Sequence, residues 1–135
     1  MAKSLTELRY GNDINALVLR VVLGLAMFYG HGLGKWKMLF GEGEIQFADP
    51  IGIGVTFSLI LAVFAEVICS FLIVGGLLTR YAIIPLIATM AVAAFVVNSG
   101  QAFGKIELPL IYLAGFVAIF FIGSGRFSLD YLIKR

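Results

Sequence analysis

The chain has 135 residues, of which 61% are hydrophobic and only 13% are charged, and its mean hydropathy is +1.02. Because a soluble domain carries about 25% charged residues, this composition excludes an ordinary soluble domain and indicates one integral membrane domain surrounded by the lipid bilayer. The net charge of +2 gives no indication of a nucleic-acid partner, while one cysteine and one histidine exclude an internal disulfide, a CxxC redox pair and a metal or haem site built from several histidines.

Four apolar segments are long enough to cross the membrane, since a span needs about 20 mostly apolar residues. Such segments form helices because lipid cannot satisfy backbone N–H and C=O groups. The first segment is interpreted as a retained helix, because Gly-Lys-Trp-Lys follows it at residues 34–37 in place of a small-residue cleavage site. The sequence therefore predicts an all-α antiparallel bundle in a single domain, residues 1–135, with transmembrane helices at residues 14–33, 55–78, 81–103 and 108–124.

The connections between the predicted spans differ greatly in length. Thr79 and Arg80 leave almost no loop between the second and third spans, which predicts a tight hairpin. Residues 34–54 form the longest connection, and Trp36 between two lysines is typical of a chain at the headgroup level. We expect part of this loop to lie on the outer membrane surface and cap the bundle; a plain solvated loop is the alternative.

Residue types in the third and fourth spans predict where these helices begin and how they pack. Pro85 and Pro109 are expected in the first helical turns, where a missing N–H group costs little. Small residues in the third span predict close packing without a large cavity on that side. These residues are Ala82, Ala88, Ala91, Ala93 and Ala94.

The basic residues predict the orientation in the membrane. With four spans, both termini and the hairpin at Arg80 share one side, and that side carries more basic residues than the other. The positive-inside rule then places both termini in the cytoplasm and makes the chain a multi-pass protein of the cytoplasmic (inner) membrane. The cytoplasmic set is Lys3, Arg9, Arg80, Arg126, Lys134 and Arg135, and the opposite set is Lys35, Lys37 and Lys105.

Arg20 and Glu66 are charged residues inside predicted spans, and each costs about 2.5 to 3.5 kcal/mol to insert. Arg20 is near the cytoplasmic end of its helix, where it could snorkel to water. Glu66 is near mid-helix, so it must face the bundle interior and be either protonated or paired. One stripe of the first helix carries Arg20, Gly24, His31 and Lys35. If it faces the second helix, Arg20 could meet Glu66, and Gly24 would allow close approach.

Such an Arg20–Glu66 pair has two interpretations of equal weight. It could only fix helix register, as polar pairs in bundles can. It could instead belong to a ligand or proton site, because ionisable groups inside membranes often mark function. A protonated, hydrogen-bonded Glu66 is a third possibility. Lys35 lies just beyond the predicted first span and is expected to anchor that helix at the headgroups.

His31 and Glu107 lie near the predicted outer side. The simpler interpretation of His31 is a hydrogen bond to a carbonyl, but an imidazole titrates near neutral pH, which suits proton transfer to a membrane quinone or an ion. The simpler interpretation of Glu107 is a helix cap, where the helix dipole favours its charge. The sharper hypothesis is a ring of His31, Glu66 and Glu107 around one outward-opening cavity.

The C-terminal run has a mainly structural interpretation. Gly123 and Gly125 are expected to end the last helix, and Arg126 is then expected to anchor at the cytoplasmic headgroups. Asp130 is placed to pair with Arg126 at spacing i, i+4. Arg80, in the hairpin on the same face, is the alternative partner of Asp130.

These residues together form an ordered pattern that resembles the DoxX family of small prokaryotic membrane proteins. The likeness covers nearly the whole chain, and the closing Gly-x-Gly-Arg-x-Ser-x-Asp run is its most specific part. The resemblance implies a four-helix bundle in the cytoplasmic membrane. Family members are associated with quinone-coupled oxidases, thiosulfate oxidation and oxidative-stress or thiol-redox assemblies. The pattern consists of Arg20 with Gly24, His31-Gly32 with Lys35, Glu66, Gly75-Gly76, residues 77–80 and residues 123–130.

Two functions fit these observations. The first is an accessory or binding subunit of a quinone-linked redox or oxidative-stress system, which holds a hydrophobic small molecule in the bundle and is not an enzyme on its own. Its expected partners are a bound quinone or lipid-like ligand, redox proteins and a second copy in a homodimer, with no intrinsic cofactor or metal. The second is a proton- or ion-coupled transporter that uses Glu66. The first is preferred, because a paired carboxylate is a poor proton carrier.

Overall fold

The computed structural model describes residues 10–134 and is helical, with no β-strand in that range. Four helical stretches are long and apolar enough to cross a membrane. The predicted all-α, four-span membrane fold is therefore confirmed. Three basic residues used for the orientation, Lys3, Arg9 and Arg135, lie outside the described residues. The four stretches are Gly11–Phe40, Val55–Gly75, Thr79–Val97 and Phe103–Ile122.

Three of the four spans contain a π-helical turn, labelled η, in which the backbone holds one extra residue per turn. Such turns displace the side chains that follow and are frequent at functional sites. The first stretch is α1 (Gly11–Met27), η1 (Phe28–Gly32) and α2 (Leu33–Phe40). The second is α3 (Val55–Val63), η2 (Phe64–Cys69) and α4 (Ser70–Gly75). The third is α5 (Thr79–Val92) and η3 (Ala93–Val97). The fourth is α6 (Phe103–Ile122), and the short α7 (Leu129–Lys134) follows it.

The first membrane helix is longer than the sequence predicted. It continues through Lys35 and Trp36 to Phe40, and it ends where Gly41 and Gly43 begin the loop. Its 30 residues correspond to about 45 Å at 1.5 Å per residue. Lys35 was assigned to the loop because charge is rare in a span, but lysine is a good helix former. The helix therefore carries Lys35 alongside the second span.

The third and fourth spans begin earlier than their prolines suggested. Counted from Thr79 and Phe103, Pro85 and Pro109 are each the seventh residue of the helix. The expectation that they lie in the first turns is therefore wrong. A proline at this depth removes one helical hydrogen bond. Near Pro85 the Thr89 hydroxyl donates to the Pro85 carbonyl at 2.7 Å.

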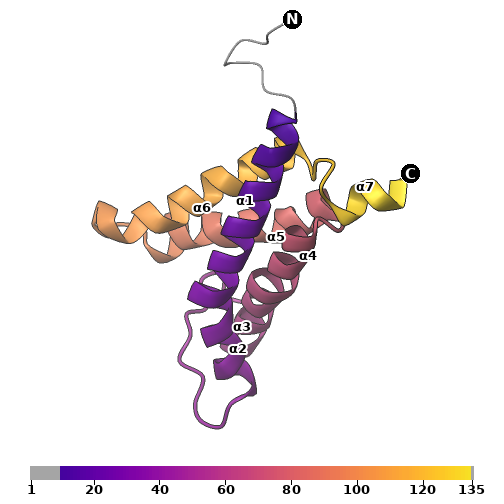
Figure 1. Cartoon of the computed structure of the whole chain (residues 1–135). Helices are drawn as coiled ribbons and strands as arrows, with labels where there is room; N and C mark the ends of the chain where they lie inside the picture. The colour runs from indigo at the N-terminus through magenta and orange to yellow at the C-terminus, as the bar shows by residue number, and fades with distance from the viewer. Residues whose placement is uncertain (1–9, 135) are drawn as a thin grey trace, which may run out of the picture.

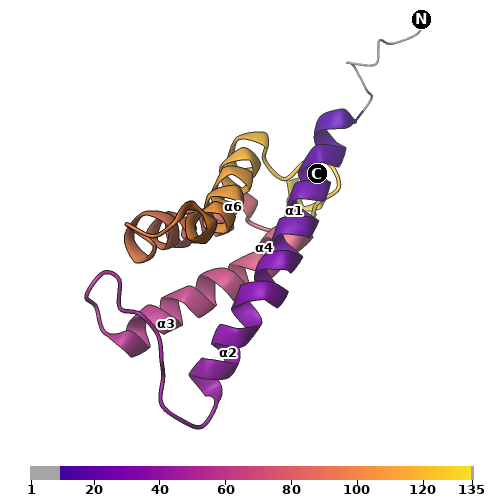
Figure 2. The same ribbon diagram turned by 90° about the vertical axis from the view of Figure 1, so that its left-hand side faces the viewer.

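The chain folds as two helical hairpins. They meet near the end of the molecule where α7 lies, and they spread apart toward the other end (Figures 1 and 2). In the first hairpin, α1 and α2 run antiparallel to α3 and α4; in the second, α5 packs along α6. The main core lies where they meet and includes Met27 and Cys69 from the first hairpin and Leu86 and Phe116 from the second. A smaller core under the loop contains Leu59 together with other apolar residues of α3 and η2.

Two glycines fix the register of the first hairpin. A Cβ atom on Gly24 would lie 2.5 Å from Val74 Cγ2 and 3.0 Å from the Ser70 carbonyl oxygen. A Cβ atom on Gly32 would lie 2.5 Å from the carbonyl oxygen of Glu66. Close backbone approach at Gly24 is confirmed, and Gly32 is a second such point. Because the helices are antiparallel, these two contacts place each turn of α1 and η1 opposite a defined turn of the second span.

We predict that Gly32→Ala destabilises the protein by about 1 to 3 kcal/mol, because the added methyl group meets backbone atoms of η2 that cannot rotate away. Gly30→Ala is the matched control, since a Cβ at Gly30 meets nothing within 4 Å. Thermal unfolding of both variants in the same detergent measures the difference. Equal unfolding temperatures for Gly32→Ala and wild type would show that the two π-helical turns are not in tight contact.

Candidate functional site

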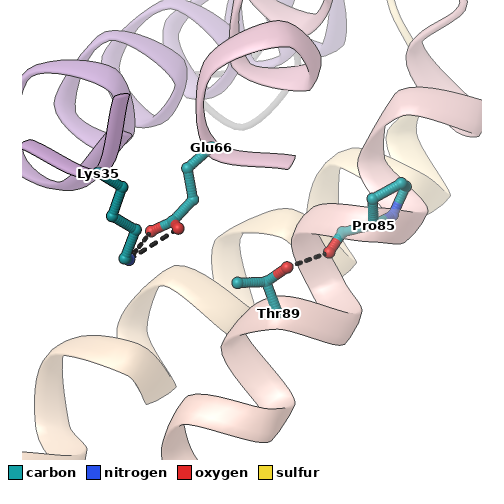
Figure 3. A network of polar contacts seen from close by, with 4 residues as sticks. All are labelled: Lys35, Glu66, Pro85 and Thr89. Atoms are coloured by element: carbon teal, nitrogen blue, oxygen red, sulfur yellow. Dashed lines mark hydrogen bonds and ion pairs between the residues drawn. The ribbon is translucent and has the colours of Figure 1, made fainter. Parts of the chain in front are cut away.

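Glu66 forms an ion pair with Lys35 inside the membrane-spanning region (Figure 3). The Lys35 Nζ atom lies 2.6 Å from Glu66 Oε1 and 2.7 Å from Oε2. Glu66 is 0% exposed, and the side chain of Lys35 is 25% exposed. The expectation that Glu66 is buried and either paired or protonated is thus met by pairing, with a partner that the sequence had assigned to membrane anchoring.

The two π-helical turns bring this pair together. Glu66 belongs to η2, whose backbone touches Gly32 at the end of η1. Lys35 follows Gly32 by three residues, about one helical turn, so its side chain starts beside η2. A long, flexible lysine then reaches the carboxylate. The ion pair therefore depends on the close approach at Gly32 and on the helix continuing past Leu33.

An apolar cavity of about 430 Å³ lies between the two hairpins, with Lys35 in its wall. One side is formed by α3 and η2, the opposite side by α5 and η3, and the third side by the loop at residues 47–53. The small residues of the third span were expected to pack without a large cavity, and this expectation is wrong. Ala88 and Ala93 line the cavity, because short side chains leave room that the spread second hairpin does not fill.

One carboxylate holds the loop that closes the cavity. Asp49 accepts hydrogen bonds from the backbone of Ile53 at 3.0 Å and Gly54 at 2.9 Å, and from the Ser58 hydroxyl at 2.9 Å. Partial desolvation favours the neutral acid, but the hydrogen bonds, the one from Gly54 first, hold the pKa of Asp49 below its ordinary value. Asp49 therefore stays charged near neutral pH and ties the loop to the start of α3.

Arg20 does not meet Glu66, so the predicted pairing is wrong. Its guanidinium is 0% exposed and donates to the carbonyl oxygens of Ile73 and Val74 at 3.2 Å each, and to that of Phe127 at 2.6 Å. The antiparallel register explains this: Arg20 lies one turn beyond Gly24, which is opposite the C-terminal end of α4. Arg20 adds hydrogen bonds to carbonyls in the last turn of α4, where backbone acceptors exceed the helical donors, and it links α4 to the C-terminal segment.

Asp130 does not pair with Arg126 or Arg80. It accepts from the backbone N–H groups of Leu78 at 2.8 Å and Thr79 at 3.0 Å, at the start of α5. Desolvation opposes its charge, but these hydrogen bonds, chiefly that of Thr79, hold the pKa of Asp130 below its ordinary value. A carboxylate at a helix N-terminus is also favoured by the helix dipole. Asp130 therefore fastens the C-terminal segment to the α4–α5 turn.

The two arginines proposed as partners of Asp130 contact other groups. Arg126 forms an ion pair with Asp13 at 3.8 Å, and its backbone N–H donates to the same carboxylate at 3.0 Å. Arg80 donates to the carbonyl oxygen of Phe120 at 3.1 Å. Both contacts bind the ends of the spans to each other, because Asp13 is in the first turn of α1 and Phe120 is near the end of α6. The C-terminal run therefore makes structural contacts, as expected, but the predicted pairing of Asp130 with Arg126 or Arg80 is wrong.

His31 and Glu107 do not line the cavity. The His31 ring is half-buried and packs edge-on against Tyr112 of α6, with centroids 5.5 Å apart. Glu107 is exposed on the first turns of α6. Of the residues predicted for a ligand or proton site, Glu66 alone is joined to the cavity wall, through Lys35.

Comparisons with known proteins agree with this architecture. The DoxX family profile matches residues 15–99, which is more than half of the chain. The chain belongs to the DoxX family. Two uncharacterised proteins of Haemophilus influenzae are similar to it: one is 30% identical over 132 residues, covering 93% of this chain and 87% of the relative, and the other is 34% identical over 124 residues, covering 83% and 85%. No solved structure matches the chain.

The DoxX match contains the whole candidate site. Lys35, Glu66 and every residue of the cavity wall lie within residues 15–99. Arg20 and its two acceptors in α4 are also within this range. The closing run at residues 123–130, expected to be the most specific part of the resemblance, lies outside the matched residues. The DoxX region thus comprises the three spans that build the site.

Sequence reasoning missed Lys35 as a site residue and the loop residue Phe47 as part of the wall. Lys35 was on the same helical stripe as His31, so the periodicity contained the signal, but its position after Leu33 suggested an anchor. Phe47 was predicted only to be an apolar residue of the loop. Its ring lies 6.0 Å from Lys35 Nζ, a contact that requires the loop to fold back over α3.

We predict that Lys35→Met destabilises this DoxX protein by no more than about 3 to 5 kcal/mol, the cost of leaving a buried charge without its partner. The partial exposure of Lys35 lowers the cost, because water can still reach the pair. The double variant Lys35→Met/Glu66→Gln should recover to within about 1 kcal/mol of wild type, since it removes both charges. Unfolding free energies in detergent measure these values.

Lys37→Met is the control for this experiment, because Lys37 is exposed and lies only two residues from Lys35. It should change the unfolding free energy by no more than about 0.5 kcal/mol. If Lys35→Met is as stable as Lys37→Met, the Lys35–Glu66 ion pair does not support the fold.

Proposed function

We propose that this protein is a membrane-embedded binding subunit that holds a hydrophobic small molecule, of the size and character of a quinone, in the cavity beside Lys35. The observation that carries the proposal is the junction of an apolar cavity of about 430 Å³ with a buried ion pair. Ligand sites are commonly apolar cavities of about 300 to 1,000 Å³ with a few placed polar groups. This cavity has both features.

The chemical character of the wall supports a ligand over a merely structural void. Phe47, Phe64 and Met90 offer apolar and aromatic surface to a ring or a chain. Lys35 offers an N–H donor at one side of the same cavity. A quinone carbonyl could accept that hydrogen bond while its ring and tail remain in apolar surroundings.

The role we propose in the cell is that of an accessory subunit in a quinone-linked redox or oxidative-stress system, with a redox protein as partner. The association of DoxX proteins with such systems supports this role. By itself the chain would bind and present the quinone, and a partner would carry out the electron transfer. A homodimer is compatible with this role.

The orientation we propose follows from the basic residues. Among described residues, Arg80, Arg126 and Lys134 lie at the end of the molecule where α1 begins, α6 ends and α7 lies. Lys35 and Lys37 belong to α2, and Lys105 to the start of α6, toward the other side. By the positive-inside rule, we propose that the termini lie in the cytoplasm. The protein itself would then be in the cytoplasmic (inner) membrane. The loop at residues 41–54 and the cavity beneath it would face the opposite side.

The ligand proposal predicts that the purified protein co-isolates a quinone, and that Glu66→Gln lowers the retained amount at least fivefold. Without the carboxylate, the Lys35 ammonium in the cavity wall is an uncompensated charge, which holds water and anions that compete with the uncharged quinone. The measurement is quinone extracted per mole of protein, quantified by absorbance after chromatography. Glu107→Gln makes the same chemical change at an exposed position outside the cavity and should retain the wild-type amount.

A contrary outcome would be substrate-dependent proton uptake into liposomes, abolished by Glu66→Gln, from protein that retains no quinone. That result would assign a proton-coupled transporter instead of a binding subunit.

The orientation proposal predicts that the variant Glu44→Cys reacts with a membrane-impermeant maleimide in spheroplasts, whose cytoplasmic membrane is intact. The variant Lys134→Cys should react only after the membrane is permeabilised. Both positions are exposed, whereas the native Cys69 is buried and provides the unlabelled background. The reverse labelling pattern would place the termini outside.

A further inference from the structure

The charge of the Lys35–Glu66 pair limits what the cavity can hold. The ammonium carries three N–H groups, and the two Glu66 oxygens are its hydrogen-bond acceptors among the described residues. At least one N–H therefore remains for a ligand in the cavity. The carboxylate cancels the charge of the ammonium, so the cavity wall offers one donor with no net positive charge.

The hydroxyl groups in the wall add no further donors. The Thr89 hydroxyl already donates to the Pro85 carbonyl, and the Ser58 hydroxyl already donates to Asp49. Figure 3 shows the Thr89 bond directed along its own helix. Each of these oxygens can therefore only accept a hydrogen bond from a ligand. An anionic head such as a carboxylate, sulfate or phosphate needs several donors and a positive charge, and this wall supplies neither.

The cavity extends to the lipid-facing surface of the bundle. Three apolar residues of its wall, Leu61, Phe64 and Val97, are 43%, 43% and 47% exposed. They lie on α3, η2 and η3, at the spread side of the two hairpins. In a membrane this surface faces acyl chains, so a ligand can enter sideways and leave a long tail in the bilayer.

We propose that the cavity selects an uncharged, chain-bearing amphiphile dissolved in the bilayer, whose carbonyl or hydroxyl oxygen accepts the free N–H of Lys35, and that Glu66 sets this selectivity by cancelling the lysine charge. This inference rests on the proposed binding function and specifies its ligand class. Glu66 acts through Lys35 and is a positioning residue for the ligand head. Quinones and long-chain alcohols belong to the accepted class, and alkyl anions do not.

The test compares two probes with the same alkyl chain, tetradecanol and tetradecyl sulfate, the second kept below its micellar concentration. Binding to the purified full chain in lipid nanodiscs is measured with radiolabelled probes. We expect wild type to bind the alcohol at least tenfold more tightly than the sulfate. Glu66→Gln should reverse this preference, because it exposes an uncompensated ammonium to the cavity. Glu107→Gln should bind both probes as wild type does.

The variant Lys35→Met/Glu66→Gln covers the case in which Glu66→Gln does not fold. It has no donor and no charge, so its affinity for the alcohol should fall at least fivefold. Wild type that binds the sulfate as tightly as the alcohol overturns the selectivity but leaves the binding function intact, as does unchanged alcohol binding in the double variant. Wild type that binds neither probe and no quinone overturns the proposed function itself.

Discussion

The close contact between Gly32 and the backbone of Glu66 is the constraint on which the rest of the site depends. Because glycine has no side chain, two π-helical turns can lie against each other, and the lysine one turn later reaches a carboxylate that would otherwise be buried without a partner. A buried acid of this kind must be paired or neutral. The contact supplies the pairing and places the resulting dipole at the edge of a cavity.

The two internal cations of the first span have different tasks. Arg20 is fully buried and donates to three backbone carbonyls, which join the end of α4 to the segment before α7. Asp130 supports the same junction from the other side by capping α5. Lys35 lies about four helical turns further along the same span, beside a cavity and partly accessible. Charge inside this membrane protein therefore serves structure at one end and the candidate site at the other.

Most of the fold could be predicted from the sequence. Long apolar runs have one stable form in lipid, so the number of spans and the hairpin at Thr79 followed directly from composition and spacing. The requirement that Glu66 be buried with a partner was also predictable, because no water is available at mid-span. The choice of Arg20 as that partner failed. Both residues lay on suitable helical stripes. A stripe shows which face of its helix a residue occupies, but it does not show which residue of the neighbouring helix lies at the same height.

The sequence by itself determined a four-span α-helical membrane protein with an acid in its interior, because the hydrophobic effect and backbone hydrogen bonding act on local composition. Tertiary structure alone decided which cation reaches Glu66, where the C-terminal acid binds, and that small residues of α5 leave a cavity. These outcomes depend on antiparallel register and on how far the second hairpin spreads. Both are set by contacts between residues distant in sequence, such as Gly32 with Glu66, and no local pattern encodes them.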